Sequence, residues 1–176
     1  TATTEDELTE LIIRKNNLID VRGVEDIYTI DPVHSRDFDD AFSVRKEGEN
    51  HIINIYISNV PLWMEALDLW ESFSNRISSI YLPDRKRPML PTVLSDALCS
   101  LTQNDTRFAL RLSLTINQTF EIVSHRFDNC AIRVKKNLRY DTPAQENNKD
   151  YKMIFGVIKK MNRKKSMLIQ LGIAMM

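Results

Sequence analysis

The fold is decided by the stretch Thr29-Ile30-Asp31-Pro32-Val33-His34-Ser35-Arg36-Asp37-Phe38-Asp39-Asp40-Ala41. Four carboxylates lie within ten residues, and β-forming runs at 27–30 and 41–44 stand on either side of them. Asp37 and Asp39 are two positions apart, so an extended backbone would point both side chains the same way. Phe38 supplies apolar packing that could hold the segment rigid. The sequence therefore predicts an ordered acidic loop between two strands.

Crowding of this kind needs an explanation, because four like charges repel one another unless something compensates them. A divalent cation is the simplest compensation, and Mg²⁺ prefers hard oxygen ligands such as carboxylates. Two such ions can activate a water and stabilise the leaving oxygen in phosphodiester hydrolysis. His34 alone makes no zinc pattern. The alternative is a calcium-binding or merely capped acidic surface loop, although the spacing lacks the central Gly and terminal Glu of a calcium hand loop.

The composition suits one globular domain, or a large part of one: 176 residues, 43% hydrophobic and 27% charged. Net charge is zero, yet the charges are unevenly placed. The region 151–176 has no acid and contains six cations: Lys152, Lys159, Lys160, Arg163, Lys164 and Lys165. Separate acidic and basic patches suit a metal site beside a phosphate path, and chance clustering on solvated faces is the alternative.

Several features place the chain inside the cell. Cys99 and Cys130 make no disulfide framework and are expected to be reduced core residues. No run of about 20 apolar residues could span a membrane. The polar, acidic start does not have the pattern of a signal peptide. We therefore predict a cytoplasmic protein without membrane association.

Hydrophobic periodicity and turn residues predict an α+β fold, a mainly antiparallel sheet with helices packed on it. Hairpins are expected for 41–46 with 51–58, through Gly48-Glu49-Asn50, and for 108–116 with 119–127, through Asn117-Gln118. The other expected elements are helices at 5–17, 67–80 and from 151 onward, helical turns at 94–101, an irregular segment at 81–91, a strand extension at 131–134 and a loop at 143–148.

A second motif follows in the chain: Tyr81-Leu82-Pro83-Asp84-Arg85-Lys86-Arg87-Pro88-Met89-Leu90-Pro91, then Leu94-Ser95 and Cys99-Ser100-Leu101. Together with the acidic stretch and a lead-in at 18–22, it resembles the ribonuclease II family. That family's RNB catalytic domain is shared by ribonuclease II, ribonuclease R and the exosome-associated exonuclease. The resemblance covers roughly residues 15–140 and rests on two separated motifs in the right order.

The resemblance implies hydrolysis of single-stranded RNA from its 3′ end, with release of nucleoside 5′-monophosphates. It makes Tyr81 similar to a tyrosine that stacks on a base near the RNA 3′ end, and a packed tyrosine is the alternative. Arg85, Lys86 and Arg87 could neutralise RNA phosphates, or could belong to a solvated loop. The resemblance also implies the catalytic and metal-binding residues, with Mg²⁺ as the cofactor and Mn²⁺ as its substitute: Asp31, Asp37, Asp39 and Asp40.

The chain departs from the family pattern in two places. Tyr56-Ile57-Ser58-Asn59-Val60 stands where the family has H-I-A-D-V, and the later S-P-I-R-R-Y segment is missing, as are cold-shock and S1 domains. We therefore expect residues 1–176 to be the N-terminal portion of an RNB catalytic domain, weak or inactive alone and completed by a partner chain or a missing C-terminal half. A catalytically inactive RNA-binding or scaffolding relative is one alternative. Another is an interaction fragment that docks through Trp63, Trp70 and the Met-rich end.

Overall fold

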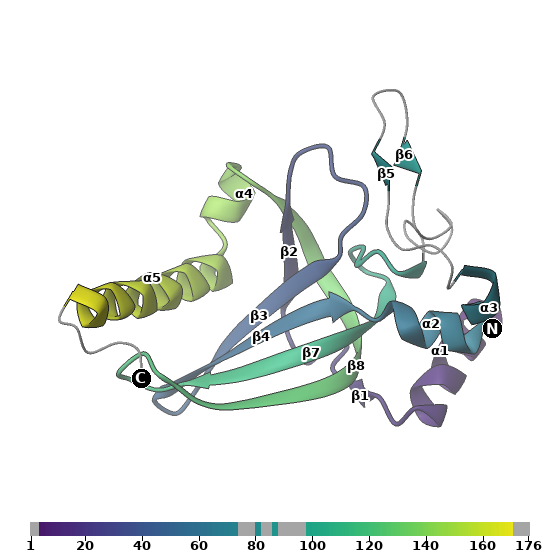
Figure 1. Cartoon of the computed structure of the whole chain (residues 1–176), viewed down its shortest axis with the longest axis horizontal. Helices are drawn as coiled ribbons and strands as arrows, with labels where there is room; N and C mark the ends of the chain where they lie inside the picture. The colour runs from purple at the N-terminus through teal and green to yellow at the C-terminus, as the bar shows by residue number, and fades with distance from the viewer. Residues whose placement is uncertain (1–3, 74–79, 82–85, 88–97, 171–176) are drawn as a thin grey trace.

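The centre of the molecule is a strongly curved β-sheet (Figure 1). The computed structural model describes residues 4–73, 80–81, 86–87 and 98–170, with side chains for 6–71 and 98–166. The elements are α1 (Thr4–Lys15), β1 (Ile19–Asp20), β2 (Ile27–Asp31), β3 (Asp40–Glu47), β4 (Asn50–Ser58), α2 (Val60–Ala66), α3 (Trp70–Phe73), β5 (Ile80–Tyr81), β6 (Lys86–Arg87), β7 (Thr106–Ile116), β8 (Ile122–Arg139), α4 (Pro143–Glu146) and α5 (Lys149–Gln170).

Strand β8 closes the sheet on itself. The strand order is β1-β8-β2-β3-β4-β7, and β7 pairs with β8 as well. Residues 122–133 of this 18-residue strand run antiparallel to β7, and residues 134–139 run parallel to β2. The predicted α+β class and mainly antiparallel sheet are confirmed. The parallel β2–β8 pair and the closure were not predicted, because they join residues about a hundred positions apart.

Both predicted hairpins are present. β3 and β4 pair from Asp40↔Ile57 to Glu47↔Asn50, and the chain reverses through Gly48, whose φ of 60° suits glycine. β7 and β8 pair from Thr106↔Arg133 to Ile116↔Ile122. The expected extension at 131–134 lies within β8, and the helix expected from 151 onward is α5. Local turn and periodicity signals therefore located most of the sheet.

The helix predicted for 67–80 is confirmed only in part: residues 70–73 form α3, whereas residues 67–69 lie between α2 and α3 and are not helical. Helix α2 begins earlier, after Asn59, with a proline in its first turn, and it ends before Asp68. Asp68 has a φ of 52°, and its N–H donates to the Glu65 carbonyl at 3.2 Å, while the Leu69 N–H donates to the Met64 carbonyl at 2.8 Å. This is the Schellman pattern that ends helices. Residues 74–79 lie outside the described part.

Two further predictions need correction. Residues 81–91 were expected to be irregular, but β5 and β6 form a short antiparallel ladder, Ile80↔Arg87 and Tyr81↔Lys86. Residues 143–148 were expected to be a loop, but they begin with the single-turn helix α4. Thr142 caps α4 by accepting a hydrogen bond from the Gln145 N–H at 3.4 Å, and Pro143 suits the first helical position. Of the turns expected at 94–101, residues 94–97 lie outside the described ranges.

Apolar side chains fill the closed sheet and the space beneath its helices. Ile27, Leu101 and Ile132 are fully buried inside the sheet, while α1 and α2 pack together with Phe108. Both cysteines are free and buried, which confirms that they are core residues without a disulfide, and burial raises the pKa of each thiol to about 11. Within the described ranges, no helix combines the length and the apolarity that a membrane crossing needs.

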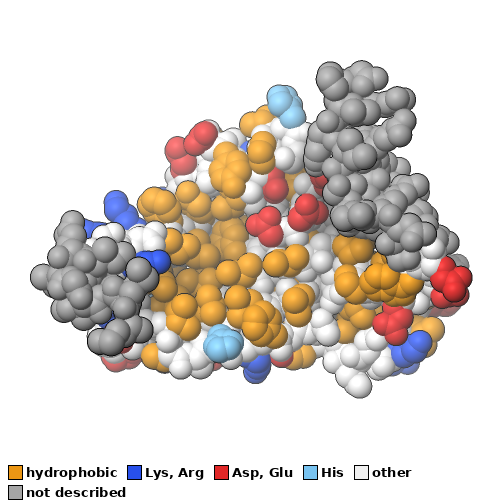
Figure 2. Space-filling view, viewed as in Figure 1, with side chains coloured by type: hydrophobic (Ala, Val, Ile, Leu, Met, Phe, Trp, Pro, Cys, Tyr) orange, Lys and Arg blue, Asp and Glu red, His pale blue; other side chains and the backbone are white. Residues whose placement is uncertain are grey.

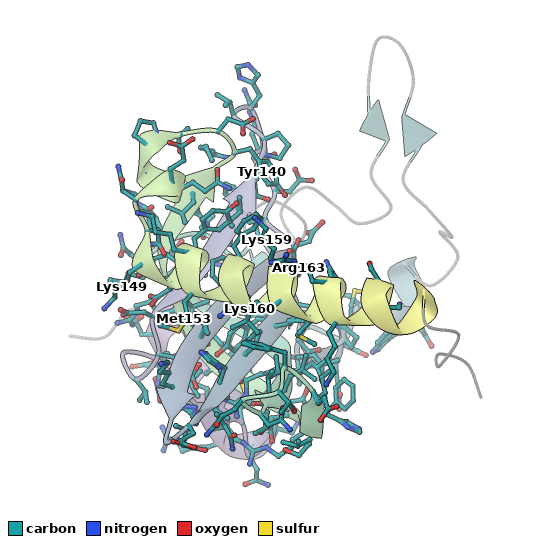
Figure 3. The ribbon with its side chains drawn as sticks, turned by 90° about the vertical axis from the view of Figure 1, so that its left-hand side faces the viewer. Tyr140, Lys149, Met153, Lys159, Lys160 and Arg163 are labelled. Carbon is teal, nitrogen blue, oxygen red and sulfur yellow. The ribbon has the colours of Figure 1, made fainter. Side chains whose placement is uncertain are left out.

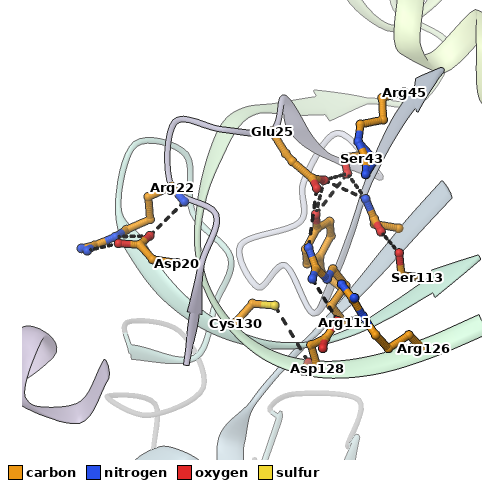
Figure 4. Close-up of polar contacts among 12 residues, drawn as sticks. Asp20, Arg22, Glu25, Ser43, Arg45, Arg111, Ser113, Arg126, Asp128 and Cys130 are labelled. Atoms are coloured by element: carbon orange, nitrogen blue, oxygen red, sulfur yellow. Dashed lines mark hydrogen bonds and ion pairs between the residues drawn. The ribbon is translucent and has the colours of Figure 1, made fainter. Parts of the chain in front are cut away.

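A network of polar side chains crosses the interior of the sheet (Figure 4). The Glu25 carboxylate accepts hydrogen bonds from Tyr56 Oη and Asn54 Nδ2, both at 2.7 Å, and from the Ser43 hydroxyl. The Arg111 guanidinium lies 3.5 Å from Glu25 and 2.9 Å from Asp128. Every carboxylate of this network therefore has a cation or several hydrogen-bond donors beside it.

Candidate active site

The four aspartates lie where β2 ends and β3 begins, on a segment that we call the acidic loop (residues 31–40). Asp31 is the last residue of β2 and Asp40 is the first of β3, with Asp37 and Asp39 between them. The loop closes one end of the curved sheet (Figure 1), and Figure 2 shows Asp and Glu side chains beside a broad hydrophobic surface. The strands thus bring the predicted metal ligands to one end of the molecule.

The backbone of the acidic loop is held from outside. The Phe38 N–H donates to Ser100 Oγ at 3.0 Å, and the Phe38 carbonyl accepts from the Leu101 N–H at 2.8 Å. The Asp39 carbonyl accepts from the Ser58 N–H at 2.9 Å. The Phe38 side chain is buried, as the sequence predicted. These contacts fix the loop through the residues between its aspartates.

Arg139, at the end of β8, supports the other half of the loop. Its Nη1 donates to the carbonyls of Pro32 and Ser35, at 3.1 and 3.3 Å. Its guanidinium carbon lies 5.0 Å from the centroid of the Phe38 ring. Arg139 is also the register partner of Asp31 in the β2–β8 pair. One cation therefore braces the loop backbone and approaches its first carboxylate.

The surroundings of Asp31 disfavour its charged form. Burial raises the pKa of Asp31, and the charges of Asp40 and Asp39 raise it further, against a hydrogen bond from Thr29 and the charge of Arg139. Its Oδ2 is buried and has no hydrogen-bond partner among the residues that the structure describes. Such an oxygen is costly to bury and is suited to receive a ligand. The mutual repulsion expected from the sequence is thus present between Asp31, Asp39 and Asp40.

The four aspartates suit a hard divalent cation, because they offer only oxygen ligands. One of these oxygens, Asp31 Oδ2, is buried and has no partner among the described residues. Asp39 and Asp40 are exposed, and Asp37 is half-buried. Across the described ranges, no three His, Cys, Asp or Glu side chains stand close enough to hold a metal ion as they are placed. An ion would therefore have to draw the exposed carboxylates toward Asp31.

Arg107 contacts Ser100, the residue whose side chain holds the acidic loop at Phe38. Its Nε donates to the Ser100 carbonyl at 2.7 Å, and its Nη2 forms an ion pair with Asp105 at 3.0 Å. Arg107 is therefore a buried ion-pair partner. Sequence reasoning did not assign a role to Ser100 or Arg139. Ser100 stands within the second motif, whereas nothing local marks Arg139.

The predicted RNA contacts lie on or beside a small hairpin at the same end of the molecule as the loop (Figure 1). Tyr81 belongs to β5, and Lys86 and Arg87 belong to β6. Their side chains, and all of Arg85, lie outside the described part, so their proposed contacts stay predictions. Of the two tryptophans expected in a core or an interface, Trp63 is buried and Trp70 is exposed.

The departure from the H-I-A-D-V pattern has a structural role here. Asn59 precedes α2, and its Nδ2 donates to Asn129 Oδ1 at 2.9 Å. Tyr56, at the histidine position, is fully buried in the polar network of Glu25. Both substituted side chains therefore serve internal contacts rather than the acidic loop.

Comparisons with known proteins agree with this geometry. Residues 19–161 match the RNB domain family. Ribonuclease R of Chlamydia muridarum is 36% identical over 118 residues, which are 65% of this chain and 17% of that protein. The chain thus spans about a sixth of the length of that relative.

Solved structures share the fold. Mycoplasma genitalium RNase R in complex with ribose-methylated single-stranded RNA has a TM-score of 0.64 and 22% identity, over 91% of this chain and 25% of that one. Yeast Ssd1, described as a pseudonuclease, has a TM-score of 0.68 and 15% identity, over 91% of this chain and 20% of its own. The fold is therefore found in a nuclease and in a protein called a pseudonuclease.

Proposed function

The chain belongs to the RNB domain family, and on that premise we propose that it contributes the acidic half of the active site of a 3′-to-5′ exoribonuclease. The substrate is single-stranded RNA, and the products are nucleoside 5′-monophosphates. One observation carries the proposal: the buried, unpartnered Oδ2 of Asp31 lies in a loop whose carboxylates raise the pKa of Asp31. Relatives named ribonuclease R support it.

The cofactor of this proposal is Mg²⁺, for which Mn²⁺ can substitute. Asp31, Asp37, Asp39 and Asp40 would hold it, with Asp31 as the buried ligand. When bound, the ion would supply activation of a water and stabilisation of the leaving oxygen. The residues of the chain do the positioning: Ser100 and Arg139 hold the backbone of the loop that carries the carboxylates.

The remaining parts of the proposal concern RNA and the completion of the site. Tyr81 stacks on a base, and Arg85, Lys86 and Arg87 neutralise phosphates. A partner chain or a further segment supplies cationic groups that stabilise charge on the phosphate in the transition state. These roles follow from the family motifs in the sequence.

A substitution in the loop tests the catalytic assignment. In the parent protein with its complete catalytic domain, Asp39→Asn should lower release of nucleotides from a labelled single-stranded RNA in Mg²⁺ by at least about 100-fold, since loss of a mere supporting group around a metal costs 10–100-fold. Binding of the same RNA in EDTA, measured by fluorescence anisotropy, should stay within about twofold, because affinity comes from phosphate and stacking contacts. Glu49→Gln, on the exposed β3–β4 turn, is the control. Equal loss of affinity and turnover would contradict a metal-ligand role.

The second candidate is a catalytically inactive RNA-binding relative, which the likeness to a pseudonuclease favours. Metal binding separates the two. Titration with Mn²⁺, followed by the electron paramagnetic resonance signal of the free ion, should show binding that Asp31→Asn and Asp39→Asn weaken. A chain that binds RNA but takes up no Mn²⁺ would be the inactive relative.

A further inference from the structure

A groove outside the acidic loop runs between α5 and the outer face of the sheet. Its floor includes Phe42 and Ile55, its helical wall includes Phe155 and Ile158, and Asp40 of the acidic loop lies at its edge. Its volume is about 310 Å³, at the lower end of the range of about 300–1,000 Å³ for ligand pockets. The groove therefore joins an apolar, hollowed surface to the acidic loop.

The helical wall of the groove carries two aromatic rings, a half-buried Tyr151 and an exposed Phe155. Tyr151 and Phe155 stack with ring centroids 5.9 Å apart and an interplanar angle of 25°. Phe155 is 54% exposed, although helix α5 has a buried side on which Val157 packs. A flat, exposed aromatic surface of this kind is a platform on which nucleic-acid bases stack, whatever their sequence.

The cations of α5 fall into two groups rather than on one face. Lys160 lies 4.9 Å from the centroid of the Phe120 ring, and Lys164 forms an ion pair with Glu121 at 2.6 Å, so both fasten the helix to the β7–β8 turn. Lys159 and Arg163 are exposed and have no acidic partner in the part of the chain that the structure describes. Figure 3 shows these two on the side of α5 toward Tyr140, away from Lys160.

Helical spacing places these free cations beside the aromatic wall. Residues four apart on a helix are neighbours, so Phe155, Lys159 and Arg163 follow one another along the same side of α5. Aromatic rings in a groove, followed by two cations one and two helical turns further along α5, match the alternating bases and phosphates of a single strand. An apolar protein segment would fill the groove but would leave the cations without a counter-charge.

We infer that this groove binds single-stranded RNA, with a base stacked on Phe155 and backbone phosphates on Lys159 and Arg163. The inference rests on the proposed function in one respect: the bound strand leads to the acidic loop through Asp40. The binding itself needs no metal ion and no cleavage, so the two ideas can fail separately.

The first test measures binding of a fluorescein-labelled 12-nucleotide oligoadenylate in EDTA at several salt concentrations. Lys159→Glu with Arg163→Glu should weaken binding at least tenfold and reduce the slope of log K against log salt by about 1.4, the value for two phosphate contacts to a single strand. The control pair, Lys15→Glu with Lys46→Glu, makes the same charge change at exposed positions on α1 and β3. Equal weakening by both pairs would overturn the site in favour of non-specific attraction.

The second test addresses stacking. Phe155→Leu keeps an apolar side chain without the ring and should weaken binding at least fivefold, whereas Phe155→Trp should keep or improve it. An oligonucleotide containing 2-aminopurine should lose fluorescence on the wild-type protein and less on Phe155→Leu. Unchanged affinity and fluorescence would overturn the inference and make an apolar protein segment the occupant. Circular dichroism checks that each variant is folded.

Outcomes for the groove and for the proposed function are distinguishable. If Asp39→Asn abolishes hydrolysis while the groove variants bind RNA as the wild type does, the groove inference fails and the nuclease stands. If the groove variants lose affinity but the wild type takes up no Mn²⁺, the nuclease proposal fails and the groove stands.

Discussion

The polar network inside the sheet and the acidic loop at its end both bring charged side chains close together, but they differ in how those charges are compensated. Inside, Arg111 lies between Glu25 and Asp128, and all three side chains are at most 12% exposed. At the loop, Asp31 keeps an oxygen that no described residue pairs, and the nearby Arg139 donates its Nη1 to backbone carbonyls. The charges of the network are therefore compensated among the described residues, whereas the charge of Asp31 is not fully compensated by them.

The pKa shifts of Asp128 and Asp31 have opposite directions, in line with this difference. Burial alone would raise the pKa of Asp128, but hydrogen bonds from Arg111 and Arg126 outweigh it, and the pKa lies below its ordinary value. For Asp31, burial and the charges of Asp40 and Asp39 outweigh Thr29 and Arg139, and the pKa lies above. A site that keeps an ionised carboxylate in unfavourable surroundings is typical of function rather than of stability.

The largest effect should come from breaking the interior network. Arg111→Met would leave Glu25 and Asp128 buried without their shared cation, and we expect a loss of about 3–5 kcal/mol in the free energy of unfolding, measured with urea. Arg126→Met removes the other cation beside Asp128, but Arg126 is 66% exposed, so it should lose less than about 1 kcal/mol. Similar losses for both variants would show that the interior network is not self-compensated.

A smaller effect of opposite sign should come from the loop. Asp31→Asn removes a charge whose neighbours oppose it, so in EDTA at pH 7 we expect the thermal midpoint to rise, by no more than about 2–4 °C, the shift that 1 kcal/mol gives a domain of this size. Differential scanning calorimetry measures it. A fall in the midpoint would mean that the Asp31 charge is already compensated within the chain.

The smallest expected effect is a difference in how Asp128 and Asp31 make stability depend on pH. Asp128 has a lowered pKa, so its contribution to stability is present above its unfolded pKa and is lost as pH falls through the folded pKa. Asp31 has a raised pKa, so its ionised form destabilises the fold above that pKa and the penalty disappears as pH falls toward about 4. The stability differences of Asp128→Asn and Asp31→Asn from wild type should therefore have opposite signs at pH 7 and shrink on acidification. Melting curves from pH 7 to 3 test this.

Local signals in the sequence predicted the parts of this fold that local chemistry decides. Gly48 marked the β3–β4 turn, and the apolar spacing of Met153, Val157 and Met161 marked α5. The helix expected at 67–80 begins only at Trp70, because Asp68 before it adopts a left-handed conformation that residues other than glycine rarely take. Closure of the sheet by β8 depends on pairing with β2, which no local pattern encodes.

The residues of the candidate site also fall into those that the sequence predicted and those that only the folded structure brings together. The four aspartates are adjacent in the chain, so their crowding was visible in the sequence. Ser100 and Arg139, which hold the loop that carries them, lie 62 and 101 positions beyond Phe38, and only folding brings them together. The sequence could not show which cations of α5 are paired, because the contacts of Lys160 and Lys164 with the β7–β8 turn form only in the folded structure.

The attachment of Phe38 to Ser100 has a consequence for how the molecule assembles. A contact between residues so far apart in the chain closes a long segment, and such closures are slow compared with hairpin formation. The β3–β4 hairpin can form early, but the acidic loop beside it has no fixed shape until the segment around Ser100 arrives. The part of the protein in which the chemistry is proposed to occur therefore matures later than the hairpin beside it.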